Sequence, residues 1–163
     1  MDERLKKVLV RLQAQCVRRE YCLRDIRPKV EKAVAAIEGI DAGKAAEEIV
    51  ASLLEDRFVD EARYAAAFAR EKSSLQGWGP DKIRYMLRVK GIDSQTITAA
   101  LGEISPEAAD KKMFSVLKAK YRTVADCPDA RLKLLKYGLG RGYSYDSLKE
   151  AVDAVISEAA EEG

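Results

Sequence analysis

The chain has 163 residues, of which 47% are hydrophobic and 34% are charged, with 29 basic against 27 acidic side chains. Its abundant Ala, Leu, Lys, Arg and Glu residues are typical of solvated helices rather than strands, and the length suffices to bury a core. The chain has no histidine, so it lacks the most frequent general base and metal ligand at neutral pH.

The first two predicted helices cover residues 3–19 and 22–36. Leu5, Val8 and Leu12 recur at helical spacing in the first helix, whose remaining surface is basic. The second helix contains Pro28, which requires either a kink or a late start. Gly39-Ile40-Asp41 then ends this segment and begins a third helix, which carries the apolar residues Ala45, Ile49, Leu53 and Leu54.

Three short helices follow in the central stretch. Asp60 can cap the first of them, and Val59 and Tyr64 occupy the positions of a hydrophobic staple. The segment Gly77-Trp78-Gly79-Pro80 supplies two helix breakers and a proline suited to the first turn of a second helix of about ten residues. Ile83, Met86 and Leu87 share one face of that helix, and Arg84 and Arg88 share another face turned away from it. Gly91 ends it, and Ile92-Asp93 begins the third helix with Ile97 as the staple partner.

The last part of the chain repeats these signals. Ser105-Pro106 predicts a helix that reaches about residue 122. The next helix follows Pro128 and uses Leu132, Leu135 and Leu139, and Gly142 ends it. Tyr143-Ser144 then begins a final helix, whose apolar face comprises Leu148, Ala151, Val152, Val155 and Ile156.

Gly39, Gly91 and Gly142 lie about fifty residues apart, and each is followed by an apolar residue and then by Asp or Ser. This spacing predicts an all-α fold of three tandem three-helix repeats, with boundaries at residues 1–56, 57–104 and 105–163. In each repeat the first two helices are rich in Lys and Arg and the third is acidic or neutral. Such a stack is suited to a polyanion or an acidic protein groove on one side, although ordinary solvated helices joined by ion pairs explain the same pattern.

Few residues suggest chemistry. The segment Gly138 to Gly142 superficially resembles a phosphate-binding loop, but no strand precedes it, and a turn is the better interpretation. Asp60 with Arg63 is better explained as a helix cap than as a catalytic pair. Trp78 is either an exposed contact or a lid over the junction of two helices, and the lid buries more area. No cofactor and no metal site are predicted.

Cys16, Cys22 and Cys127 are an odd number of cysteines without C-x-x-C spacing, which indicates unpaired thiols in a reducing compartment. The residues after Met1 are crowded with charge and do not form the apolar core of a signal peptide. No apolar run is long enough for a membrane span. We therefore predict a cytoplasmic protein that does not enter a membrane.

Several segments resemble the RecX family of recombination regulators. The resemblance is strongest from Phe58 to Ala65 and continues through Phe68, Arg70, Lys72, Gly79-Pro80, Lys82-Ile83, Leu87, Lys90-Gly91-Ile92, Ile97 and Ala100-Leu101. Arg19-Glu20 and the segment Arg141 to Asp146 resemble the family's first and last repeats. Cys22, where the family usually has serine, and Gly138 and Gly140, where leucine and arginine are more frequent, depart from the pattern.

The resemblance implies an elongated, curved array of three-helix repeats without enzymatic activity. It also implies a monomer that binds the RecA filament and inhibits its ATPase and strand exchange, with single- or double-stranded DNA as a second ligand. We expect the contact to be made by a basic face of Arg70, Lys72, Lys82, Arg84, Arg88, Lys90, Lys133, Lys136 and Arg141.

The residues that match the family signature most closely, Asp60, Arg63, Tyr64 and Gly91, are assigned to capping and packing. Tyr64→Ala is accordingly expected to cost about 3 kcal/mol of stability and to affect binding only indirectly. Two alternatives remain: a helical-repeat module that binds DNA directly without a recombinase partner, and a scaffold that binds a protein and ignores DNA.

Overall fold

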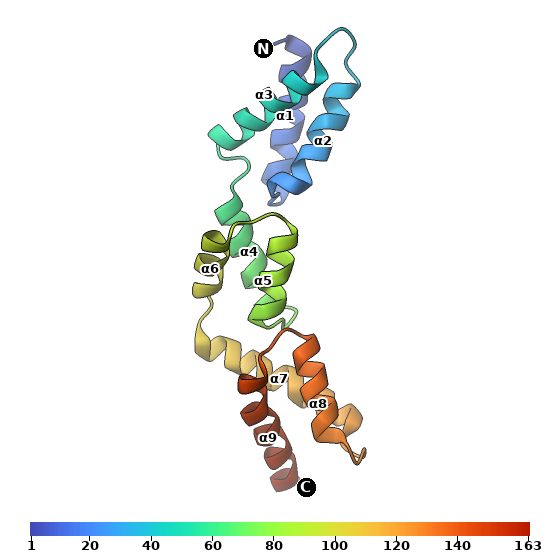
Figure 1. Ribbon diagram of the computed structural model, residues 1–163, viewed down its shortest axis with the longest axis vertical. Coiled ribbons are helices and arrows are strands. Elements are labelled where there is room, and N and C mark those ends of the chain that lie inside the picture. The colour runs from blue at the N-terminus through green and yellow to red at the C-terminus, as the bar shows by residue number, and fades with distance from the viewer.

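A computed structural model describes residues 1–163 and contains nine α-helices and no strand. The helices are α1 (Glu3–Arg18), α2 (Leu23–Ala35), α3 (Ala42–Glu55), α4 (Glu61–Ser74), α5 (Pro80–Val89), α6 (Ser94–Gly102), α7 (Pro106–Val124), α8 (Ala130–Gly140) and α9 (Tyr145–Glu162). Three groups of three helices follow one another along the long axis, with the two termini at opposite ends (Figure 1). The prediction of an elongated all-α repeat fold is confirmed. None of the helices combines the length and apolar character needed to cross a bilayer.

The predicted helix starts are confirmed at five positions, where a side-chain oxygen accepts a hydrogen bond from a backbone amide of the first turn. These caps are Asp41, Asp60, Asp93, Ser105 and Ser144. Each such cap contributes about 1 kcal/mol. The glycines that precede three of the helices adopt the left-handed conformation expected of them, with φ of 77° at Gly39, 80° at Gly91 and 98° at Gly142.

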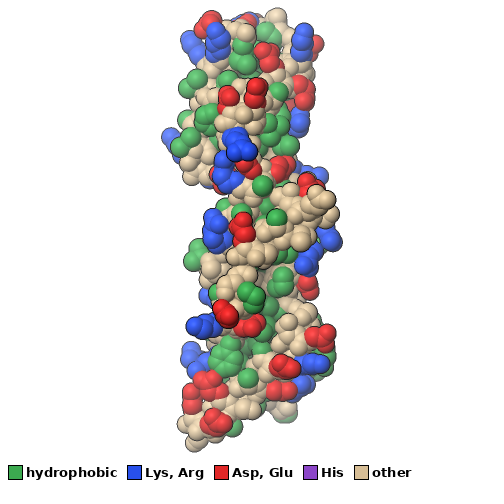
Figure 2. Space-filling view, turned by 90° about the vertical axis from the view of Figure 1, so that its left-hand side faces the viewer, with side chains coloured by type: hydrophobic (Ala, Val, Ile, Leu, Met, Phe, Trp, Pro, Cys, Tyr) green, Lys and Arg blue, Asp and Glu red, His purple; other side chains and the backbone are tan.

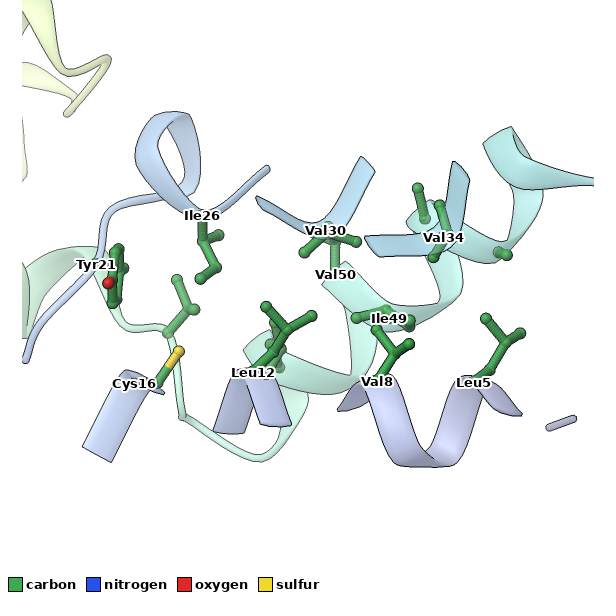
Figure 3. Close-up of a cluster of buried hydrophobic side chains, with 14 residues drawn as sticks. Leu5, Val8, Leu12, Cys16, Tyr21, Ile26, Val30, Val34, Ile49 and Val50 are labelled. Carbon is green, nitrogen blue, oxygen red and sulfur yellow. The ribbon is translucent and has the colours of Figure 1, made fainter. Parts of the chain in front are cut away.

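Buried side chains form three separate clusters, each centred on one group of helices, and Cys22 of the first group belongs to the central cluster. In the first cluster, Leu5, Val8 and Leu12 of α1 face Val30 and Val34 of α2 (Figure 3), and residues of α3 complete the core. The central cluster gathers side chains of α4, α5 and α6, and the last gathers those of α7, α8 and α9. We therefore keep the boundaries near residues 56 and 104 as a proposal for three structural units.

The predicted range of the second helix is confirmed: α2 begins at Leu23, five residues before Pro28, so the proline lies inside the helix and does not delay its start. One detail of the predicted helices is wrong. On α8, Leu132 and Leu139 are 49% and 48% exposed, and Leu134 is buried instead. The cause is Gly138: a Cβ at this position would lie 2.2 Å from Leu148 of α9, so the glycine allows close packing on the face that also carries Leu134.

Candidate functional site

The central and last units meet backbone to backbone at two glycines. The Gly79 amide donates to the Arg141 carbonyl at 2.7 Å, and the Asp81 amide donates to the Gly142 carbonyl at 3.0 Å. A Cβ at Gly79 would lie 2.4 Å from the Gly142 carbonyl oxygen. Helix α5 has no capping side chain at its start, and the last unit supplies the missing acceptors in its place.

A buried hydrogen bond closes the same junction. The Tyr143 hydroxyl donates to the Gly77 carbonyl at 2.9 Å, and burial raises the pKa of this phenol, which keeps it protonated as a donor at neutral pH. The turn after α8 is therefore engaged with the central unit. Arg141 and Gly142 form the predicted turn, whereas Gly138, Leu139 and Gly140 belong to the last turn of α8.

Trp78 covers this junction. Its partly buried indole ring packs edge-on against Phe68 with 6.1 Å between centroids. The ammonium groups of Lys72 and Lys82 lie 4.9 Å and 4.3 Å from the centre of the indole ring, within the range of a cation–π interaction. The geometry supports the lid interpretation of Trp78, and it also fixes two cations beside the lid.

Two further cations reach the other side of the turn at Gly77. A Cβ at Gly77 would lie 3.4 Å from both the Lys112 Cε and the Arg141 Nη2 atoms. We call Lys72, Lys82, Lys112 and Arg141 the junction cations. None of them forms an ion pair with a carboxylate, and the buried Nε of Arg141 has no hydrogen-bond partner. Four positive charges from separate parts of the chain are thus concentrated without local compensation.

The other predicted basic residues do not belong to this cluster. Arg84 pairs with Asp81 at 2.8 Å, Lys90 pairs with Asp25 at 2.9 Å, and Lys133 pairs with Asp129 at 3.5 Å. Three more, Arg70, Arg88 and Lys136, are exposed and have no ion pair. None of the nine predicted residues is buried. The structure places Lys72 and Lys82 over the ring of Trp78 and Arg141 beside the neighbouring Gly77.

The surface does not present a purely basic side, because basic and acidic side chains are mixed on it. Figure 2 shows basic and acidic side chains interspersed along the whole of one face. Lys112 was not among the residues singled out from the sequence, because it belongs to α7 and reaches the cluster only through the packing of α7 beside α4. Helical spacing in the sequence could not have predicted that Lys112 lies near the turn at Gly77, because the two residues belong to different structural units.

The residues that match the family signature, Asp60, Arg63 and Tyr64, stabilise the fold. Asp60 accepts from the Arg63 amide at 3.0 Å, and the Arg63 guanidinium bonds Glu20 of the first unit at 2.8 Å. Tyr64 is 7% exposed, and burial raises its pKa to about 12. These roles agree with the assignment of Asp60 and Tyr64 to capping and packing, and Arg63 additionally ties two units together.

The junction between the first and central units depends mainly on side chains. The Lys90 ammonium bonds the Asp25 carboxylate at 2.9 Å, and the Arg24 guanidinium donates to the Val89 carbonyl. Burial of Asp25 is the largest single effect and opposes its ionisation. Hydrogen bonds from Lys90 and Cys22, together with the positive charges of Lys90 and Arg19, outweigh it and lower the pKa of Asp25 below the ordinary 3.8. Cys22 of the first unit lies buried in the central cluster, where burial raises the pKa of its thiol.

The structure contains no group of three or more Cys, Asp or Glu side chains arranged to hold a metal ion.

Comparison with known proteins gives consistent results. Residues 60–101 match the family described as RecX, second three-helix domain. The chain is 30% identical to the regulatory protein RecX of Clostridium botulinum (strain Alaska E43 / Type E3) over 166 residues, which cover 96% of this chain and 77% of that protein. It is 31% identical to the regulatory protein RecX of Clostridium acetobutylicum over 121 residues, and the match spans only 56% of that relative's length.

Two solved structures share the fold. A crystal structure of regulatory protein RecX superimposes with a TM-score of 0.78 at 22% identity, over 93% of this chain and 72% of that one. The crystal structure of RecX from Lactobacillus salivarius superimposes with a TM-score of 0.71 at 19% identity, over 97% of both chains.

Proposed function

Because the chain belongs to the RecX family, we propose that it regulates the RecA recombinase by binding the RecA nucleoprotein filament and inhibiting its ATP hydrolysis and strand exchange. Relatives named as regulatory proteins support a regulatory role rather than a catalytic one. In this proposal the protein acts in the cytoplasm as a monomer and needs no cofactor.

The observation that carries the proposal is the cluster of junction cations. Positive groups without carboxylate partners raise the potential at the surface and attract an acidic protein surface or DNA phosphates. An elongated stack of helices (Figure 1) is suited to lie along the groove of a helical filament. In this proposal Lys72, Lys82 and Lys112 contact the filament. Binding of this kind is salt-sensitive, because added ions screen the attraction.

The test is a titration of the protein against RecA filaments on single-stranded DNA and against bare DNA, at two salt concentrations, with RecA ATP hydrolysis as the readout. Inhibition at protein concentrations that leave bare DNA unbound is the expected result. Equal binding to bare DNA and to filaments, with equal salt dependence, would favour the alternative of a direct DNA-binding module.

A pair of variants tests the surface itself. The triple variant Lys72→Gln, Lys82→Gln, Lys112→Gln removes three junction charges, and we expect it to weaken inhibition about tenfold or more and to reduce its salt dependence. A matched control removes three exposed charges without ion pairs elsewhere, at Lys44, Lys111 and Arg122. Equal inhibition by the two variants would show that the junction cations do not contribute to the binding surface.

A further inference from the structure

A groove runs between α1 and α2 in the first unit, away from the junctions described above. Its volume is about 990 Å³, and its lining comes from α1, α2 and the turn that follows α2. A second hollow of about 360 Å³ adjoins it and shares Val8, Arg11, Ala33 and Ala36 in its walls. No residue of α3 lines either hollow, so this side of the helix pair has no third helix over it.

The floor of the groove is formed by apolar side chains, several of them small. The partly exposed Ala33 and Ile37 lie along it beside the buried Val8, and Val10 at the rim is 62% exposed. Small residues such as Ala33 and Ala36 leave room for another helix to approach closely, at the 8–10 Å axis separation of packed helices. An uncovered apolar strip of this kind gains free energy when a partner excludes water from it.

The walls of the groove are basic. Lys7 and Arg11 project from α1 and Lys29 and Lys32 from α2, and none of the four forms an ion pair. The acidic side chains in the lining are those of Glu3 and Glu38, both at the end of the groove near the start of α1. Glu3 there pairs with Lys6 at 2.9 Å. The rest of the groove therefore combines an apolar floor with uncompensated positive walls.

We propose that this groove binds an acidic amphipathic helix of a partner protein. An apolar stripe on such a helix would cover Val10, Ala33 and Ile37, while carboxylates on its flanks would meet the four basic side chains. This is the helix-in-groove mode of recognition, in which anchors recur every three or four residues. The α1 side of the groove extends from Glu3 to Gln15, which at 1.5 Å per residue matches a helix of about three turns.

The composition of the groove disfavours a nucleic acid as occupant. Single strands bind through aromatic platforms on which bases stack, and no aromatic residue lines either hollow. A phosphate backbone would satisfy the basic walls but leave the apolar floor unused. The groove shares no residue with the junction cations, so the inference does not depend on the function proposed above.

The experiment uses the full chain and a labelled helical peptide of 14 residues, with leucine at every third or fourth position and glutamate at most others. Two control peptides replace glutamate by lysine or distribute the leucines around the helix, and a single-stranded oligonucleotide serves as competitor. We expect the acidic amphipathic peptide to bind about tenfold more tightly than either control. Equal binding of the three peptides, or displacement of the peptide by the oligonucleotide at lower concentration, would overturn the proposal.

Substitutions in and outside the groove test whether the peptide binds there. Lys29→Gln with Lys32→Gln should weaken binding about tenfold, and Val10→Asn several-fold, because these side chains form the wall and the rim of the groove. The matched double variant at Lys44 and Lys111 should bind like the wild type, and so should the variant that lacks the junction lysines. Circular dichroism checks that each variant is folded. Loss of peptide binding in the junction variant, or none in the groove variant, would refute the assignment.

Discussion

Gly79→Ala tests the backbone contact between the central and last units. A Cβ on Gly79 would lie 2.4 Å from the carbonyl carbon and oxygen of Gly142 and 2.5 Å from the Tyr143 nitrogen. These are backbone atoms and cannot rotate away as the end of a flexible side chain can. We therefore expect the two units to separate at this point.

The magnitude follows from the hydrogen bonds that the separation breaks. Two backbone bonds join Gly79 and Asp81 to the turn after α8, and the Tyr143 hydroxyl adds a third to Gly77. At about 1 kcal/mol net for each bond, the variant should lose about 3 kcal/mol of unfolding free energy. Urea unfolding followed by circular dichroism measures this loss.

The chain contains a single tryptophan, and its position at the junction makes its fluorescence a local probe. Exposure of Trp78 should shift its emission to longer wavelength in Gly79→Ala before any urea is added. Gly140→Ala is the matched control, since a Cβ there meets nothing within 4 Å, and it should stabilise α8 by up to about 1 kcal/mol. If Gly79→Ala kept wild-type stability and wild-type emission, the close approach would not exist in solution.

Tyr143→Phe should cost about 1 kcal/mol in urea unfolding, because it removes a buried hydrogen bond, while Tyr145→Phe, at an exposed position, should cost nothing measurable. Arg57 has a φ of 59°, so Arg57→Gly should raise stability by about 1 kcal/mol and Arg57→Ala should not. Asp25 has a lowered pKa, so its ion pair with Lys90 stabilises the fold fully above pH 3.8, and this contribution is lost as the pH falls from 3.8 through the lower folded-state pKa. Asp25→Asn should therefore be less stable than wild type near pH 7 on thermal unfolding, and the difference should shrink as the pH is lowered below 3.8.

The local signals in the sequence were sufficient for most of the fold. A cap such as Asp60 and a left-handed residue such as Gly91 act through their immediate neighbours, so short stretches of sequence predict them. The inward face of α8 could not be predicted in this way, since it depends on Leu148 of another helix meeting Gly138. A pattern of leucines alone favoured Leu132 and Leu139, which are exposed.

The candidate site was predictable only in part. Lys72, Lys82 and Arg141 were selected as basic residues within recognisable motifs, but composition does not indicate which lysines are neutralised. Lys90 forms an ion pair with Asp25, which lies 65 residues earlier in the chain. Lys112 joins the cluster for a similarly long-range reason. Selection among charged side chains therefore needs tertiary structure, even where the helices themselves do not.

The two ends of the central unit are attached by different kinds of bond. Paired charges at partly exposed positions, such as Arg63 with Glu20, join it to the first unit, whereas carbonyls and amides pressed together at Gly79 and Gly142 join it to the last. Concentrated electrolyte weakens the former attachment and hardly affects the latter. At high salt the first unit should therefore loosen from the central unit more readily than the last unit does, although Cys22 remains buried between the first two.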